Sequence, residues 1–319
     1  MLQVWRRSEA GEFRQVFAGD APTYSERRGA WLVVTDGGTR LRVADDEVGE
    51  QRWLTGEESE RARAAAAEAE VAGLQALLFN VTQGADVKQQ LAALKLYNVA
   101  SLIVISATVL SARDLLWAAE GRRLLLVNRV AAETDLPSVS CDSIAGTRAI
   151  ADHFHDLGVR RVAYVGGLEH TVIARERRDA FITRIAGHGM TLTDALTAGE
   201  YSYVAGWRAA QTLCLSRLPD GVCFANDILA AGGMDALRDE RGLDIPGDIM
   251  VAGFDDIAMS SWPRYQLTTV RQPVDRIVEE AVARAMPDWG AEDGVQDLRI
   301  PGELVMRRST LRDGGARRD

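Results

Sequence analysis

The chain has 319 residues, of which 47% are hydrophobic and 26% are charged, and its formal net charge is −9. This length and composition predict a large core divided between two compact lobes, and the acidic balance excludes a surface that grips nucleic acid throughout. No apolar run reaches membrane-spanning length and no secretion signal is evident, so we expect a cytoplasmic protein.

Residues 1–72 predict an atypical head of β-hairpins followed by a helix. Residues 4–6 and 13–16 flank one turn-like stretch, and residues 31–34 and 41–43 flank a second. Thr55 and Glu58 have capping-box spacing at the start of an Ala/Glu/Arg-rich helix that ends near Ala72. Through LQVWR, YSERRGAWL and WLTGEE the head resembles the tail of a restriction-endonuclease-like family whose acidic nuclease core is absent, so no nuclease activity is expected.

Residues 73–313 predict a regular α/β body, and residues 314–319 a disordered tail. Apolar strand patterns alternate with amphipathic helical patterns, which is typical of parallel sheets with right-handed crossovers. We expect strands near 77–79, 102–105, 124–127, 139–141, 162–165, 221–224 and 249–254, and helices over 86–96, 146–157, 175–188 and 205–214. The short connections at 128–142 and 268–273 are candidates for the passages between the two lobes.

The stretch 220–273 carries the strongest functional pattern. Two buried strands end at Asn226-Asp227 and at Asp255-Asp256, and in open α/β sheets ligands bind outside the carboxyl ends of the strands. Amide and carboxylate groups together satisfy the hydroxyls of a polyol. The alternative is that these residues cap the following helices. We expect both, with Asp227 and Asp256 as caps and Asn226 and Asp255 facing a ligand.

Other chemistry finds little support in the sequence. Cys141, Cys214 and Cys223 lack metal or redox spacing and are expected to be reduced core thiols. His153 and His155 are two apart, so on a helix they point to different sides. Neither a phosphate-binding loop nor a nucleophile elbow is present, and we expect no cofactor and no metal.

The body, over residues 76–311, resembles the effector-binding domain of the lactose/galactose repressor (LacI/GalR) family. The matching passages, in the order of the family, are VSCDSIAGTRAIADHFHDLGVRRVAYVGG, RERRDAFITRIAGHGM, EYSYVAGWRAA, CFANDILAAGGMDALRDERGLDIPGDIMVAGFDD, LTTVRQP and IPGELVMRRST. The resemblance implies a two-lobed periplasmic-binding-protein-like fold, a homodimer, and a sugar, polyol or nucleobase-like effector in a cleft between the lobes.

The resemblance also implies which side chains contact the effector. The positions of the family fall on Arg177, Tyr201, Asn226 and Asp255, and further contributions are expected from Asp142 and Gln272. A guanidinium fork donates to two acceptors at once, and a tyrosine ring stacks on a sugar or a heterocycle. The alternatives are a surface salt bridge for Arg177 and a core aromatic for Tyr201. Ala180 stands where the family more often has glycine.

The leading hypothesis is therefore a non-enzymatic effector-sensing module of a transcriptional regulator. A sugar-binding transport-type protein and a small hydrolase with Asp255 or Asp142 as general base are the alternatives. We find no helix-turn-helix, no hinge helix and no copy of the first strand of the family's N-terminal lobe, so DNA binding is expected only through an unrecognised or partner-supplied element. Residues 31–36 are a candidate replacement for the missing strand.

Overall fold

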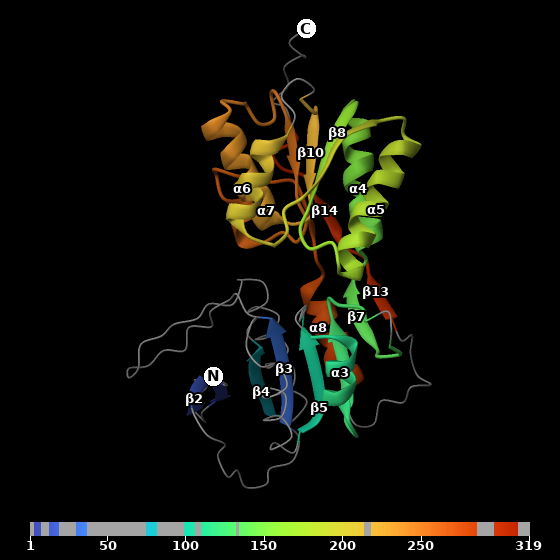
Figure 1. Cartoon of the computed structure of the whole chain (residues 1–319), viewed down its shortest axis with the longest axis vertical. Helices are drawn as coiled ribbons and strands as arrows, with labels where there is room; N and C mark the ends of the chain where they lie inside the picture. Colours follow the sequence, from blue (N-terminus) through green and yellow to red (C-terminus); the bar gives the residue numbers. More distant parts are fainter. Residues whose placement is uncertain are drawn as a thin grey trace. The chain divides into compact units, whose positions relative to one another are not determined.

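The structure is a computed structural model of the chain (Figure 1). It describes residues 3–7, 13–18, 30–36, 75–81, 99–105, 110–131, 134–213, 218–285 and 297–311, and before Ser101 it describes the backbone alone. Two compact units divide the chain: Met1–Ser140 with Val274–Ile300 form unit 1, and Cys141–Pro273 with Pro301–Asp319 form unit 2. The chain passes between the units near two of the predicted places, and also at Ile300 and Pro301, which was not predicted.

Unit 1 contains a sheet in the order β13-β7-β6-β5-β3-β4-β1-β2. Its strands are β1 (Gln3–Arg7), β2 (Phe13–Ala18), β3 (Ala30–Asp36), β4 (Gln75–Val81), β5 (Val99–Ile105), β6 (Arg123–Val127), β7 (Ser138–Cys141) and β13 (Asp297–Ile300). β3 to β7 pair in parallel, as the alternation of strands and helices predicts. The pairing of β1 with β2 is antiparallel, which confirms the first predicted hairpin.

The second predicted hairpin is wrong. β3 pairs in parallel with β4 along one edge and with β5 along the other, so neither edge accepts an antiparallel partner. This placement makes residues 31–36 a central strand of the sheet. It agrees with the other prediction for these residues, that they replace the first strand of the family's N-terminal lobe. Residues 41–43, the predicted helices at 55–72 and 86–96, Cys214 and the tail lie outside the described residues.

Two helices of unit 1 are described. α3 (Ala112–Ala119) begins at a capping box, in which Ser111 accepts from the backbone N–H of Asp114 and the Asp114 carboxylate accepts in return. α8 (Val274–Ala285) is fixed at its end by Ser101 of β5, whose hydroxyl donates to the carbonyl of Ala285 over 2.5 Å. No helix among the described residues is both long and apolar enough to cross a membrane.

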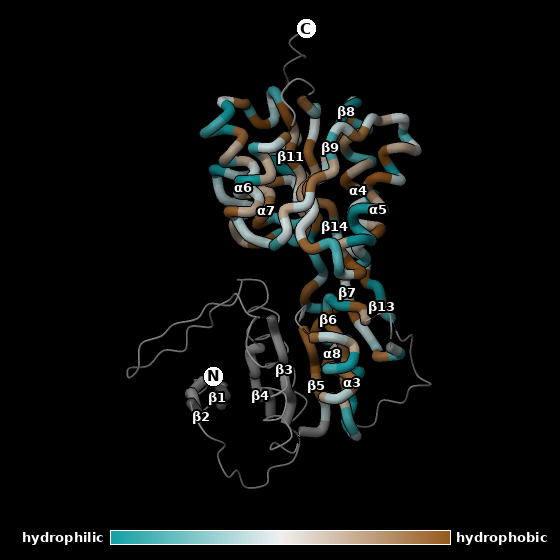
Figure 2. The backbone as a smooth tube through the Cα atoms, in the orientation of Figure 1, coloured by the Kyte–Doolittle hydropathy of each residue, from teal (hydrophilic) through white to brown (hydrophobic). Residues whose placement is uncertain are grey.

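Unit 2 contains a parallel sheet in the order β11-β10-β8-β9. The strands are β8 (Arg161–Gly166), β9 (Thr191–Thr197), β10 (Gly221–Phe224) and β11 (Met250–Ala252). Helices α4 (Ser143–Asp156) and α5 (Val172–Gly187) cover one face, and α6 (Tyr203–Thr212) and α7 (Asp227–Asp235) cover the other (Figure 1). The residues of β10 are all buried, and Figure 2 shows hydrophobic colouring along the inner strands with hydrophilic stretches on the surrounding helices and loops.

Short elements complete unit 2 around the end of β11. The π-helical turn η2 (Ala236–Glu240) continues α7, and a 3-10 turn, η3 (Ala258–Ser261), follows β11. β12 (Thr269–Arg271) and β14 (Glu303–Val305) form an antiparallel pair. These segments bring residues from the end of the chain next to the Asp255-Asp256 loop.

Glycine allows α6 and α7 to pack with their backbones in contact. A Cβ atom on Gly206 would lie 2.1 Å from the carbonyl oxygen of Leu229, and one on Gly232 would lie 1.9 Å from that of Tyr203. No side chain fits into such a gap. The two glycines therefore set the spacing of these helices.

Candidate functional site

A buried ion pair between Arg177 and Asp255 forms the centre of the candidate site. Arg177 lies on α5, Asp255 follows β11, and Nη2 of the first is 3.3 Å from Oδ1 of the second. Their side chains are only 10% and 11% exposed. This burial rules out a surface salt bridge for Arg177, because most of the guanidinium surface contacts protein.

Neighbouring elements fix the direction of the Arg177 guanidinium. Nη1 donates to the carbonyl oxygen of Ala225 over 2.7 Å, and Nε donates to Oγ of Ser143 over 3.2 Å. The ring of Phe254 stacks under the guanidinium, with Cζ 3.7 Å from the ring centroid. Burial on its own lowers the pKa of Arg177, but Asp255 opposes it and the net pKa is raised, so the group keeps its charge.

Asp255 is held in an unusual backbone conformation beside a second hydrogen-bond donor. Its φ is 120°, and the following Asp256 has a φ of 57°, both in a region that residues other than glycine rarely adopt. Oδ1 of Asp255 also accepts from Nε2 of Gln272. Strain of this kind costs on the order of 1–3 kcal/mol and persists where surrounding contacts impose it, as they commonly do at binding sites.

Tyr201 borders the same group of residues. A Cβ atom on Gly167 would lie 2.2 Å from Cε1 of the Tyr201 ring, so the ring rests directly on the glycine backbone. Burial raises the pKa of Tyr201, while Arg177 opposes the rise, and the hydroxyl stays neutral as a donor. Part of Tyr201 remains exposed, unlike a core aromatic.

The predicted capping roles in the pairs Asn226-Asp227 and Asp255-Asp256 are wrong. Asn226, the first member, caps α7 by accepting from the N–H of Leu229, whereas the second member, Asp227, is fully inside the fold. Asp256 caps no helix and forms ion pairs with Arg271 and Arg307 instead. The loop after β11 leads into the 3-10 turn η3, which begins after Ile257 and has no side-chain cap, so Asp256 lies one residue before the capping position. Asp142, also a predicted contact, caps α4 through the N–H of Ala145.

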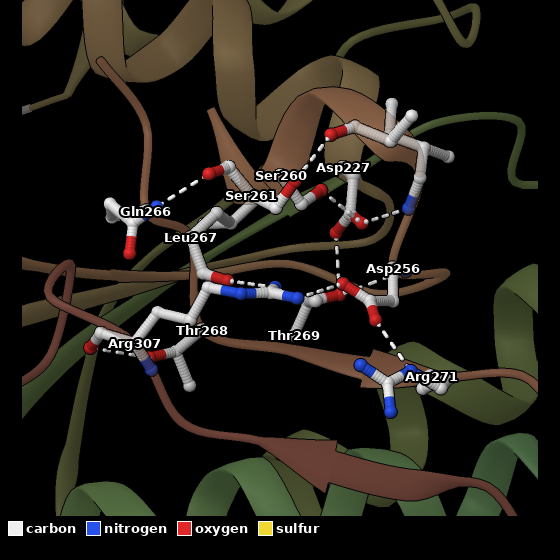
Figure 3. A network of polar contacts seen from close by, with 12 residues as sticks. Asp227, Asp256, Ser260, Ser261, Gln266, Leu267, Thr268, Thr269, Arg271 and Arg307 are labelled. Carbon is white, nitrogen blue, oxygen red and sulfur yellow. Dashed lines mark hydrogen bonds and ion pairs between the residues drawn. The ribbon is translucent and has the colours of Figure 1, made fainter. Parts of the chain in front are cut away.

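Asp227 is the centre of a buried network that the sequence did not reveal (Figure 3). Its carboxylate accepts from the hydroxyls of Ser260 and Thr269 and from the backbone N–H of Ile257, over 2.6 to 3.1 Å. Burial, and then the charge of Asp255, raise its pKa to about 8, and the three donors only partly offset this. The network fastens the Asp255-Asp256 loop to the start of α7.

The remaining candidates for chemistry have ordinary structural partners. His153 is buried against the hydroxyl of Thr310, whereas His155 stacks on His188, so the two histidines point to different surroundings as predicted. Cys141 and Cys223 are buried and not joined in a disulfide, and burial raises the pKa of Cys223. In the part of the chain that the structure describes, no three His, Cys, Asp or Glu side chains are grouped to hold a metal ion.

Comparison with known proteins supports the fold described above. The family model of the periplasmic binding protein-like domain matches residues 151–310. The chain belongs to this family. A solved LacI transcriptional regulator from a Rhodococcus species is 25% identical, with a TM-score of 0.74, and the match covers 88% of this chain and 98% of that one. The lac repressor dimer bound to operator and an anti-inducer, at 22% identity, 90% and 83% coverage and a TM-score of 0.75, shows the same fold.

Curated relatives are transcriptional regulators of the helix-turn-helix type. An uncharacterised regulator of Streptomyces limosus is 32% identical over 60% of this chain and 55% of its own length. The repressor CytR of Escherichia coli strain K12 is 26% identical over 59% of this chain and 55% of its own length. The chain thus spans about half the length of the curated relatives it matches. The comparisons support a LacI/GalR-type effector-binding domain. The candidate residues lie in its unit 2, which carries most of the match to the periplasmic binding protein-like family.

Proposed function

We propose that the chain is the effector-sensing module of a transcriptional regulator, and that Arg177, Asp255, Gln272 and Tyr201 bind a small polar effector. The observation that carries this proposal is the convergence of these four side chains beyond the carboxyl ends of β8, β9 and β11. A ligand at this edge of an α/β sheet meets fixed donors and acceptors. The regulators among its relatives support the role in transcription.

The hydrogen-bond donors and acceptors that the site leaves unused suggest the class of effector. Three of the five N–H groups of Arg177 have acceptors among the described residues, which leaves two for a ligand. Oδ1 of Asp255 is taken by Arg177 and Gln272, so Oδ2 is the oxygen available to accept. Paired donors and an acceptor beside the ring of Tyr201 suit vicinal hydroxyls on a ring. We infer a sugar, a polyol or a nucleobase-like molecule, with Asn226 and Asp142 contributing the groups that capping leaves over.

The binding is proposed to be non-enzymatic. Arg177 and Asp255 neutralise one another, and Asp255 is held by two donors rather than placed next to a nucleophile. A general base works best when its proton-accepting oxygen faces a bound reactant and its pKa is near the working pH. The arrangement suits recognition of hydroxyl groups. We place the protein in the cytoplasm, where a transcriptional regulator acts.

A screen for thermal stabilisation tests the effector proposal. Sugars, polyols and purines are added to the full chain, and a ligand at one hundred times its dissociation constant adds about 2.7 kcal/mol to the stability of the folded state. The shift should vanish in Arg177→Ala and in Asp255→Ala. It should persist in Arg161→Ala, which removes an ion pair with Asp220 from the exposed end of β8. A hit that survives both site variants, or a complete panel without a hit, would contradict the proposal.

We also propose that the chain forms a homodimer through the face of unit 2 that carries Val204 and Trp262. Val204 and Trp262 are 49% and 53% exposed, and each lies within three residues of a tyrosine that bonds to Asp235. The adjacent Tyr203 and the nearby Tyr265 both donate to the carboxylate of Asp235 over 2.8 Å. This shared acceptor holds the segment of Trp262 against α6, so the apolar face is rigid before it meets a partner.

A further inference from the structure

Unit 2 contains a hollow whose lining includes none of the proposed effector-binding residues. It has a volume of about 260 Å³ and lies between α5, the ends of β8 and β9, and the loop that joins β8 to α5. Its lining includes Tyr164, Glu169, Ala174, Arg178, Ala195 and Leu196. Ala174, Arg178 and Ile182 are spaced by four and form one stripe of α5, which does not include Arg177. The hollow is therefore lined by a different face of α5 from the one that carries Arg177.

Tyr164 lines this hollow and carries a hydroxyl without a hydrogen-bond partner among the described residues. Tyr164 is 1% exposed, and its hydroxyl oxygen is buried with no hydrogen-bond partner among the described residues. The ring runs from β8 toward the carboxyl end of the strand, because a Cβ atom on Gly166 would lie 3.4 Å from its Cε1 atom. On its inner side the ring packs on Phe181 of α5, 5.7 Å between centroids. A buried hydroxyl normally has a partner, since leaving it unpaired costs free energy.

The opposite side of the hollow carries positive charge. The guanidinium of Arg178 is 34% exposed and lies 3.6 Å from Glu169, whose carboxylate also accepts from the hydroxyl of Thr197. Arg175 adds a second guanidinium, which donates to the carbonyl oxygen of His170 over 2.9 Å. The N-terminus of α5 adds its own positive partial charge. Arg178 is shared between Glu169 and Asp179, 3.0 Å away, whereas the guanidinium of Arg175 bonds only to backbone carbonyls among the described residues, so Arg175 is the charge at the rim that a ligand carboxylate can pair with.

We propose that this hollow is an accessory binding site for a small ring-shaped organic acid. Apolar walls from Ala174, Ala195 and Leu196 surround the ring, and the hydroxyl of Tyr164 donates to an oxygen at its inner end. The carboxylate of the ligand lies at the rim, near Arg175 and Arg178. The side chains of Arg177 and Asp255 take no part, so the accessory site stands or falls independently of the proposed effector site.

The accessory site shares one wall with the candidate effector site. Gly167 lines the hollow and also supports the ring of Tyr201. A ligand that orders the loop of Gly167 changes the support of Tyr201, which couples the two sites through a common segment. Occupancy of the hollow is therefore expected to alter the affinity for the effector.

Titration of the full chain with 4-hydroxybenzoate, followed by ligand-observed NMR and calorimetry, tests the proposal. This probe has an apolar ring, an oxygen that accepts from Tyr164 and a carboxylate at the other end. Tyr164→Phe removes only the hydroxyl and should weaken binding about 5-fold, as the loss of one hydrogen bond does. Ala195→Phe should abolish binding by filling the hollow. Thr191→Phe, at the exposed start of the same strand, is the matched control and should bind normally.

The outcomes separate this site from the effector site. Asp255→Asn should retain the affinity for 4-hydroxybenzoate, because Asp255 does not line the hollow. Loss of the probe in Asp255→Asn would overturn the proposal by assigning the probe to the effector site. Unchanged affinity in Tyr164→Phe and in Ala195→Phe would overturn it as well. So would the absence of saturable binding at about 10 mM, a concentration at which a weak ligand of this size still registers.

Discussion

Arg177 and Asp255 are 78 residues apart in the sequence, yet their side chains form an ion pair that is almost closed to solvent. A pair of this kind is held by geometry more than by net attraction, because both charges have lost their hydration. The carbonyl of Ala225, the hydroxyl of Ser143 and the amide of Gln272 supply the hydrogen bonds that water no longer makes. The site is thus preorganised by the fold of unit 2.

Arg177→Ala is expected to destabilise unit 2 even without an effector. The change leaves the carboxylate of Asp255 buried without its cation, which typically costs about 3–5 kcal/mol. Denaturation by urea, followed by circular dichroism, measures the loss. Arg161→Ala breaks a pair whose members are 49% and 34% exposed, and it should cost less than about 1 kcal/mol. Equal losses in the two variants would show that the Arg177 pair is no more than a surface contact.

Asp227 is expected to make the stability of the fold fall as the pH rises toward about 8. Its pKa is about 8 in the folded chain, against an ordinary value of 3.8, so between these values the folded state holds a proton that the unfolded state lacks. The stabilisation is complete below pH 3.8 and is lost as the pH passes through the folded pKa. Denaturation measured at several pH values should show this slope, and Asp227→Asn, which mimics the protonated group, should flatten it.

The control for this pH dependence is Asp220→Asn. The pKa of Asp220 is lowered: burial raises it, but hydrogen bonds from Arg161 and from the Arg160 and Arg161 amides outweigh burial. Its contribution is therefore present above the ordinary value and is lost only in acid, so the slope between about pH 5 and pH 8 should not change. A steep slope that survives Asp227→Asn would assign the pH dependence to another group.

The sequence predicted which side chains lie together better than it predicted their individual roles. Arg177, Asp255 and Gln272 converge as expected, because the carboxyl ends of parallel strands meet at one edge and the passages marked these positions. The choice between Asn226 and Asp227 as the cap failed, because a doublet of polar residues after a strand does not reveal where the first helical turn begins. That choice depends on the contact between Asp227 and the loop that contains Asp256, and these residues are far apart in the sequence.

Two strand predictions failed, one because the strand has no apolar run and one because the pairing partner was wrong. β9 was missing from the expected strands because its sequence, TLTDALT, has no apolar run, as suits a strand with a free edge. β3 was placed in a hairpin by the Asp36-Gly37-Gly38 turn pattern, although its apolar run equally suits the centre of a parallel sheet. Local turn chemistry cannot decide between these pairings, since the strand partners come from elsewhere in the chain.

Gly206→Ala is expected to separate α6 from α7. The added Cβ atom would lie 2.1 Å from a backbone oxygen of Leu229, and overpacking against backbone typically costs about 1–3 kcal/mol. Gly187→Ala, also in a helix, meets nothing within 4 Å and should be neutral or stabilising by up to about 1 kcal/mol. Urea denaturation of the two variants makes the comparison. If both alanines stabilise the chain, the close packing of α6 on α7 is not required.

Trp262→Asp is expected to convert the proposed dimer to a monomer. The tryptophan is 53% exposed beside the 3-10 turn η3, and a buried carboxylate in the middle of an apolar interface would have no cation to compensate it. Arg264, two residues on, is already bonded to Asp235 and Asp239, so it is not available for this purpose. Sedimentation equilibrium over a range of concentrations measures the change. Leu116→Asp is the matched control, because Leu116 is 52% exposed on α3 of unit 1, and its variant should remain dimeric. A dimer that withstands Trp262→Asp, or one that Leu116→Asp also breaks, would remove the assignment of the interface to the face of Val204 and Trp262.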